Sequence, residues 1–337
     1  MSTRLAALAT VLAIMFMLIN PVSASAHIAG SGGSPSNYRA TVTGIRPAVP
    51  TVGVTVGVGG QWVRVTNQGA AQIVIVGYQG EPFLRLSSNR AEVNQLSNTA
   101  VETGQIPGAP VAVDPSAEPR WAQLRDGDSA TWTDNRINPE AQGDAQRQPE
   151  QASGSWELPL VVDGRQVTVL GTWERVPPPS PWPWLVAVGL LTAAVAAIGW
   201  RRNWHRPMAA AIAGGILAFV LHLLGTGFAP QQGGPVFGWI GVGAVGAFSM
   251  LIGAVAALST VRRSESAPDR AITVGIMVLL LAATDISVLW NSQLPFAGPA
   301  VLDRGLTAAT YATALGLLVA GGRLVRERSL ARRGQEE

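Results

Sequence analysis

The sequence predicts an all-β domain followed by a bundle of five membrane-spanning helices. The chain of 337 residues is 47% apolar and only 13% charged, with a mean hydropathy of +0.25, which is too apolar for an ordinary soluble protein. Long apolar runs occur only at the N-terminus and after residue 181, whereas the region between them is rich in Val, Thr, Gly and Pro. The chain has no cysteine, which excludes disulfides, thiolate metal sites and cysteine nucleophiles.

Residues 1–26 are predicted to be a secretory signal peptide. Arg4 precedes an apolar run over residues 5–19, and small residues follow it up to Ala26. The run is shorter than the roughly 20 residues that span a bilayer, which favours cleavage over the alternative of an uncleaved anchor. Cleavage after Ala26 would make His27 the first residue of the mature chain.

Residues 27–176 are predicted to form an extracytoplasmic β-sandwich of immunoglobulin-like or CopC-like type. Short runs of Val, Ile, Thr and Trp are separated by Gly, Asn, Asp and Pro, without a helical period. Asp163-Gly164 predicts a tight hairpin turn, and Gly59-Gly60 a second turn. Long loops are expected at 98–119 and 135–154. Nine strands are predicted, at residues 40–45, 52–58, 62–66, 72–76, 83–86, 121–124, 130–133, 156–162 and 166–173.

Residues 182–322 are predicted to cross a membrane five times, after a proline-rich spacer at 177–181 that holds the β domain just off the bilayer. Each of five apolar stretches is long enough for a transmembrane helix. They cover residues 182–200, 208–225, 236–258, 271–290 and 305–322, and a basic tail follows at 323–337.

The arginines predict the orientation of these helices. The first and third connections between the predicted spans, together with the tail, contain eleven arginines and five acidic residues. The second and fourth connections contain a single arginine, Arg304. Positive charge marks the cytoplasmic side, so the β domain is expected outside a plasma membrane and the tail inside the cell. The basic groups then meet anionic lipid headgroups and the exported part is slightly acidic, so the expected partner is the lipid bilayer and not nucleic acid.

Three polar residues within the predicted spans form a candidate intramembrane cluster. His222 and Asp285 each lie 14 residues from the cytoplasmic start of their span, or about 21 Å along the helix, and Tyr311 reaches a similar level. Ionisable groups at that depth are costly unless they face the bundle interior and pair with one another. The cluster is expected to be a structural pairing, a proton or ion relay, or a metal-linked site.

The predicted new terminus at His27 is a candidate copper ligand. Its α-amine, its amide nitrogen and its imidazole together make a ligand set suited to Cu(II). The alternative is a solvated terminus without a role, because signal peptidases leave whatever residue follows the cut. The β domain has no other histidine, so further ligands would be carboxylates such as Asp126, Asp128 or Asp134.

Residues 77–86 are the candidate contact for a partner. Tyr78 and Glu81 belong to a turn-rich run near a strand end, where loops of a sandwich carry recognition. The alternative is an ordinary structural turn. No nucleophile–base, phosphate-loop or zinc-protease pattern is present, so an enzyme is not expected.

Three stretches resemble a family of uncharacterised membrane proteins of high-GC Gram-positive bacteria. They are SPSNYRATVTGIRP (34–47), VGYQGEPFLRL (76–86) and WELPLVVDGRQVTVLGTWERVPPPSPWPW (156–184). The resemblance implies no activity. It does imply a Trp-His-Asp-His-Arg motif where this chain has Trp132-Thr133-Asp134-Asn135-Arg136, so both histidine positions are substituted here. In layout alone, the chain also resembles the CopC and CopD copper proteins.

The sequence therefore predicts a non-enzymatic plasma-membrane protein whose exported β-sandwich binds a ligand or an envelope protein. One alternative is an envelope copper-handling protein that uses His27 and passes the metal towards His222. A second alternative is a small transporter with an exported regulatory domain.

Overall fold

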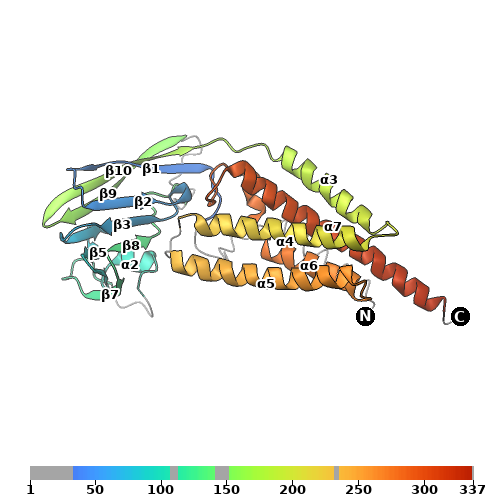
Figure 1. Cartoon of the computed structure of the whole chain (residues 1–337). Coiled ribbons are helices and arrows are strands. Elements are labelled where there is room, and N and C mark those ends of the chain that lie inside the picture. The colour runs from blue at the N-terminus through green and yellow to red at the C-terminus, as the bar shows by residue number, and fades with distance from the viewer. Residues whose placement is uncertain (1–32, 107–112, 141–151, 231–234, 336–337) are drawn as a thin grey trace.

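The computed structural model describes residues 33–106, 113–140, 152–230 and 235–335, with the side chains of 235–238 left out. A β domain is followed by a helical part, and the two lie end to end in an elongated molecule (Figure 1). The predicted signal peptide at 1–26 and the predicted copper ligand His27 lie outside the described residues, so both stay predictions.

The described part of the β domain contains all nine predicted strands and one more. The additional strand is β6, Arg90–Asn94, whose sequence RAEVN alternates polar and apolar residues but has only one residue of high strand propensity, Val93. A short helix, α2 (Asn98–Glu102), forms within the predicted loop 98–119. The other strands are β1 (Tyr38–Arg46), β2 (Val52–Val56), β3 (Val63–Asn67), β4 (Ile73–Val76), β5 (Pro82–Ser87), β7 (Trp121–Asp126), β8 (Ser129–Trp132), β9 (Ser153–Val162) and β10 (Arg165–Arg175).

The strands form two antiparallel sheets around one core. Seven strands pair in the order β1-β10-β9-β4-β5-β6-β7, and three pair in the order β2-β3-β8. Phe83 on β5 and Trp132 on β8 meet edge to face between the sheets, with ring centroids 5.7 Å apart, and both are fully buried. Large aromatic rings in such contact contribute strongly to a core that has no disulfide. The division into seven and three strands differs from the four and three of an immunoglobulin constant domain.

Both predicted turns are present. Asp163 and Gly164 have φ angles of 47° and 78° and join β9 to β10, where Val162 pairs with Arg165. Gly59 and Gly60 also have positive φ angles, within the short 3₁₀ helix η1 (Val58–Gly60). A tight hairpin needs such angles, which explains why these residue types predicted the turns correctly.

Within the described residues, the helical part contains five α-helices, of which three are long and apolar enough to cross a membrane. These are α4 (His205–Phe228), α7 (Ala300–Arg333) and, within α5 (Pro235–Val261), the segment Trp239–Val261. The other two, α3 (Trp182–Ile198) and α6 (Ala267–Leu281), have 17 and 15 residues. The prediction of five spanning helices therefore holds only in part.

One predicted helix boundary is wrong, and another helix is longer than its predicted span. The span predicted at 271–290 breaks after Leu281 and continues as the 3₁₀ helix η2 (Asp285–Leu289). The carbonyl of Ala282 accepts from the Asp285 N–H at 2.9 Å and also from the Tyr311 hydroxyl, so it links the break to α7. At the other end, α7 runs through the predicted tail to Arg333, and there Arg328 pairs with Asp269 in the first turn of α6 and Arg332 with Glu265 just before α6.

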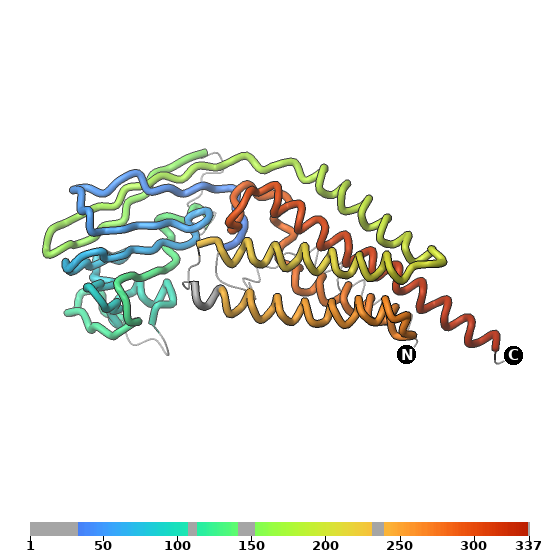
Figure 2. The backbone as a smooth tube through the Cα atoms, in the orientation of Figure 1, coloured from blue at the N-terminus to red at the C-terminus, as the bar shows by residue number. Residues whose placement is uncertain are grey.

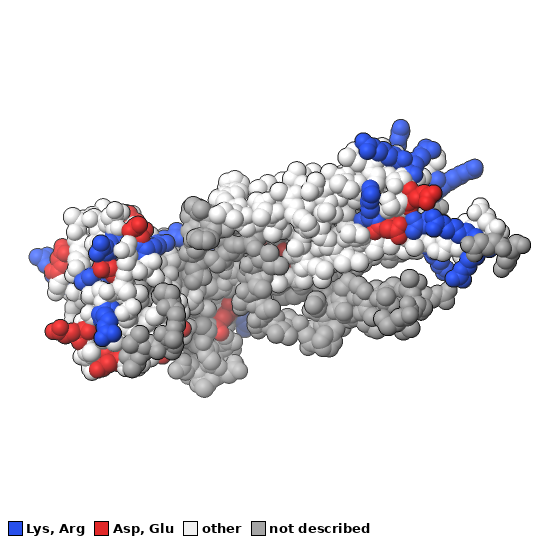
Figure 3. Space-filling model, turned by 90° about the horizontal axis from the view of Figure 1, so that it is seen from below, with Lys and Arg blue, Asp and Glu red and all other residues white. Residues whose placement is uncertain are grey.

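The surface of the described residues is divided by polarity. Only Val101 and Val113 are large, apolar and exposed in the described part of the β domain, whereas exposed Leu, Val, Ile, Phe and Met side chains occur throughout the helices. Charged side chains gather over the β domain and at the opposite end of the helices, and the described surface between them is largely uncharged (Figure 3).

A hydrogen-bonded contact, termed here the interdomain seam, joins the two parts. Ser36 and Gln293 form a two-way backbone pair, with N···O distances of 2.9 and 2.8 Å. The Ser292 hydroxyl donates to the Asn37 side chain and to the Val176 carbonyl. The seam thus joins the start of β1 and the residue after β10 to the loop between η2 and α7. The backbone trace in Figure 2 shows these blue and red segments meeting.

The close packing of β10 predicts the effect of a single methyl group. A Cβ on Gly171 would overlap the Trp156 ring, whereas a Cβ on Gly44 of the neighbouring strand would meet no atom within 4 Å. We expect Gly171→Ala to destabilise the β domain by about 1–3 kcal/mol and Gly44→Ala to have a smaller effect. The stability of each variant is measured by thermal unfolding, with proteolysis of the β domain as the readout. Equal stability of the two variants would contradict this packing.

Candidate functional site

Two groups of buried polar side chains are the candidate sites. One links a turn, a loop and α2 of the β domain, and the other joins three elements of the helical part. Burying a polar or charged side chain costs free energy unless it forms hydrogen bonds or ion pairs. Each of these two sites is therefore defined by the partners that its buried side chains find.

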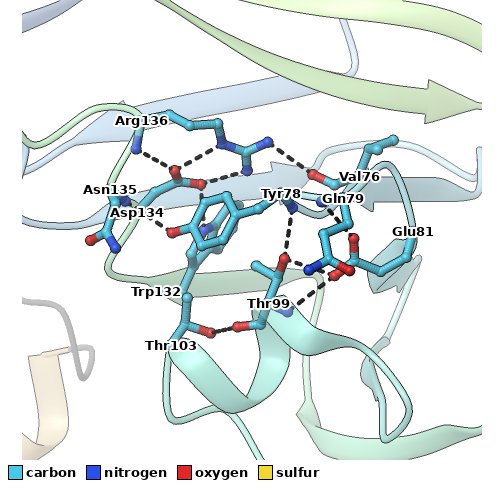
Figure 4. A network of polar contacts seen from close by, with 10 residues as sticks. All are labelled: Val76, Tyr78, Gln79, Glu81, Thr99, Thr103, Trp132, Asp134, Asn135 and Arg136. Atoms are coloured by element: carbon cyan, nitrogen blue, oxygen red, sulfur yellow. Dashed lines mark hydrogen bonds and ion pairs between the residues drawn. The ribbon is translucent and has the colours of Figure 1, made fainter. Parts of the chain in front are cut away.

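Asp134 is the centre of the β-domain network shown in Figure 4. This carboxylate has no exposed surface, and the Arg136 guanidinium binds both of its oxygens, at 2.9 and 2.7 Å. The Trp132 indole N–H donates to it at 2.9 Å. Arg136 also donates to the Val76 carbonyl and lies over the Tyr78 ring, 4.9 Å from its centroid. The network therefore fastens the loop after β8 to the end of β4.

Glu81 fastens the same turn to α2. Its carboxylate accepts hydrogen bonds from the Ser97 hydroxyl, from the backbone and hydroxyl of Thr99, and from the backbone of Gln79, at 2.8 to 3.0 Å. Burial raises the pKa of the Glu81 carboxyl, but the bonds from Thr99 and Ser97 outweigh burial and lower it overall. A Cβ on Gly77 would overlap this carboxylate, so the turn requires glycine there.

The structure corrects the prediction that Glu81 is presented to a partner. The residue is 3% exposed, and protein donors reach both of its carboxylate oxygens. Tyr78 is half-buried, and its hydroxyl accepts from the backbone N–H of Asn135 at 2.9 Å. Burial, followed by the Asp134 charge, raises the pKa of Tyr78. The exposed residues of this edge are instead Gln79, Gly80, Val101, Glu102 and Asn135.

His222 is the centre of the helical group, at the end of α4 nearest the β domain. Its Nδ1 lies 2.6 Å from an Asp303 oxygen at the start of α7, and its Nε2 lies 3.4 Å from an Asp285 oxygen on η2. His222 and Asp303 are buried, whereas the Asp285 side chain is 19% exposed. We call these three residues the His222 cluster.

The structure brings two of the three predicted intramembrane residues into direct contact. His222 meets Asp285, whereas Tyr311 lies in the same region but bonds to the Ala282 carbonyl. Asp303 was missed because the predicted span began at residue 305, which left Asp303 in a loop. Its position in the first turn of a helix, where acidic residues are favoured, was the available signal.

The described residues contain no group of three or more His, Asp or Glu side chains arranged to hold a metal ion. Of the carboxylates predicted as further copper ligands, Asp134 is bound by Arg136 and Trp132, and Asp126 accepts from Gln123. Both ring nitrogens of His222, the predicted destination of the metal, face carboxylates. Copper binding by His27 stays a prediction.

No protein-family model, curated protein or solved structure matches this chain. The likeness to actinobacterial membrane proteins therefore stays a prediction, and function is argued from the geometry alone.

The buried carboxylate of Glu81 predicts a pH-dependent contribution to stability. Its lowered pKa means that the stabilisation is present at neutral pH and is lost as the pH falls below the ordinary value of 4.5. We expect Glu81→Gln to destabilise the β domain by about 1–3 kcal/mol at neutral pH, because an amide nitrogen cannot accept these hydrogen bonds.

The difference between Glu81→Gln and the unchanged protein should shrink in acid, which unfolding curves at several pH values measure. Glu157→Gln is the matched control, because Glu157 is exposed on β9. A Glu81→Gln deficit that is constant with pH would rule out the stated role of the carboxylate.

Proposed function

We propose that this protein is a multi-pass plasma-membrane protein whose exported β domain is a non-enzymatic binding or assembly module. The observation that carries the proposal is the division of the surface. Exposed apolar side chains occur along the helices, and charged side chains gather at the two ends (Figure 3). A bilayer covers the first kind of surface and leaves the second kind in water.

We further propose that α3 and α6 lie in the bilayer with the three longer helices. Leu185, Val186, Leu190 and Leu191 are exposed along α3, which is the side-chain distribution of a lipid-facing helix. Its 17 residues extend about 26 Å, which is near the thickness of a hydrocarbon core. On α6, η2 prolongs the path of the chain towards the β domain.

The orientation is supported by the basic end of the helices. Arg201, Arg202, Arg262 and Arg263 lie exposed at the ends of α3 and α5 that are far from the β domain. Positive charge of this kind is typical of the cytoplasmic side, which supports the proposal that the β domain lies outside the cell.

A binding role is supported by the edge that Asp134 and Glu81 hold in place. Their bonds fix the turn Gly77–Glu81, α2 and the loop after β8 in one arrangement, while Gln79 and Val101 stay exposed beside them. A rigid edge loses little conformational entropy when it binds, which suits a recognition surface. The two sheets around one core likewise support the predicted sandwich, on which such edges carry loops.

The orientation predicts which residues a membrane-impermeant maleimide reaches. Because the chain has no cysteine, each single-cysteine variant carries one thiol. We expect Ser155→Cys on β9 to be labelled in intact cells and Ser329→Cys on α7 only after permeabilisation, since both positions are exposed. Ser249→Cys, which is fully buried on α5, is the unlabelled control. Labelling of Ser329→Cys in intact cells would refute the orientation.

The binding role predicts position-specific crosslinks. A photo-crosslinking amino acid at Gln79 or Val101 should capture a discrete envelope component in living cells. The same amino acid at Gln166, exposed beside the β9–β10 turn, should capture none. Equal capture at all three positions, or at none, would argue against this edge as the binding surface. Gel shifts of the crosslinked protein measure the outcome.

A further inference from the structure

We propose that the His222 cluster binds one proton from the outer side of the membrane, and that the bound proton holds the β domain against the helices. The inference goes beyond the proposed binding role but rests on the proposed orientation. The labelling of Ser155→Cys and Ser329→Cys decides that orientation independently.

The geometry of the cluster fits a protonated imidazole. Carboxylate oxygens of Asp303 and Asp285 face Nδ1 and Nε2, at 2.6 and 3.4 Å. A neutral imidazole has one N–H and one lone pair, so one nitrogen would then present a lone pair to a carboxylate. Only the imidazolium donates to both. The longer contact, to Asp285, is the weaker of the two and the one that deprotonation would break first.

The surrounding charges balance only when that proton is present. Asp285 on η2 and Asp303 on α7 contribute two negative charges, and Arg304 on α7 contributes one positive charge close enough to interact with Asp303. Tyr311 on α7 is the other titratable group beside them, and its hydroxyl donates to the Ala282 carbonyl. The elements packed against α4 add no charged residue at this level, in α3, in α6 or in the described side chains of α5. A neutral His222 would leave one buried negative charge uncompensated.

The proton can exchange only with the side on which the β domain lies. Asp285 is the exposed member of the cluster, with 19% of its side chain accessible, against 1% for Asp303. Between the cluster and the other end of the helices, the described parts of α4, α5, α6 and α7 contain no Asp, Glu, Arg or His until Arg206, Arg262, Arg270 and Arg323. Proton relays need a chain of such groups. The cluster therefore responds to external pH and does not conduct protons.

The loop between Asp285 and Asp303 connects the cluster to the interdomain seam. Phe296 in this loop stacks on the His222 ring, with centroids 6.3 Å apart, and packs against Gly225, where a Cβ would overlap its ring. The Ala297 N–H donates to the Gly225 carbonyl at 2.9 Å. Ser292 and Gln293 of the same loop form the seam with the β domain.

His222 thus holds residues on both sides of the loop that carries the β domain. Arg304 adds a second tie, since it donates to the carbonyls of Val288 and Asn291. Loss of the proton releases the Asp285 side of the loop, and the seam loosens. The β domain is therefore held firmly at low external pH and more loosely as the pH rises.

A disulfide across the seam tests the inference. Ser36 and Gln293 are a two-way hydrogen-bonded antiparallel pair, for which the Cα atoms lie about 5.5 Å apart, within reach of a disulfide. The rate of crosslinking of S36C/Q293C in cells under a mild oxidant is divided by that of T41C/T172C. This second pair is in register on β1 and β10, away from the helices, and corrects for the effect of pH on thiol chemistry.

We expect the ratio of rates to fall by about fivefold or more as external pH rises from about 6 to about 10. In His222→Gln the ratio should be low and independent of pH. In Asp285→Asn a neutral His222 is already charge-balanced, so the transition should move down by about one pH unit or more. Acidifying the cytoplasm alone with a permeant weak acid should leave the ratio unchanged.

A ratio that does not change with external pH, or that changes equally in His222→Gln, would overturn the inference. A response to cytoplasmic pH would overturn the one-sided access. If His222→Gln does not accumulate in the membrane, Asp285→Asn decides alone, because it keeps the short contact between His222 and Asp303. An unshifted transition in Asp285→Asn would then count against the proposal.

Discussion

The pairing of His222 with Asp285 and Asp303 is the interaction that ties together the three elements of the helical part next to the interdomain seam. An ionisable ring in apolar surroundings must be compensated locally, and here the compensating groups come from two other elements, η2 and α7. Asp285 lies on η2 just after the break in α6, Asp303 lies at the start of α7, and Phe296 in the loop between them stacks on the His222 ring. The loop between Asp285 and Asp303 also carries Ser292 and Gln293, so the residues that pair with His222 flank the segment that contacts the β domain.

The β domain uses the same principle with different partners. Asp134 and Glu81 are buried acids whose carboxylates accept hydrogen bonds from arginine, indole, hydroxyl and backbone N–H groups. These bonds compensate the buried negative charges and hold the loops together. Their effect is to convert a turn, a short helix and a loop into one rigid edge. Glu81 and Asp134, which the sequence suggested as binding residues, therefore form their hydrogen bonds within the β domain. Their neighbours Gln79 and Val101 are exposed on the surface of this edge.

The elements that were predicted well are those whose signal is local. The strands alternate between core and solvent, and Asp163-Gly164 is a turn sequence whatever surrounds it. The elements that were missed depend on distant residues. β6 is stabilised by pairing with β5 and β7, α6 ends where Tyr311 can bond to Ala282, and α7 extends to Arg333, where its arginines meet Glu265 and Asp269.

The sequence by itself determined the order of the two parts, the strand-rich composition of the first and the apolar helices of the second, because hydrophobic period and turn chemistry act over a few residues. It also marked His222, Asp285 and Tyr311 as a polar cluster, of which the structure brings His222 and Asp285 into direct contact. Only the tertiary structure decided the two sheets, the role of Asp303 and the burial of Glu81. Each of these depends on contacts between residues far apart in the chain, and the sequence separation of 81 between His222 and Asp303 leaves no local trace of their contact.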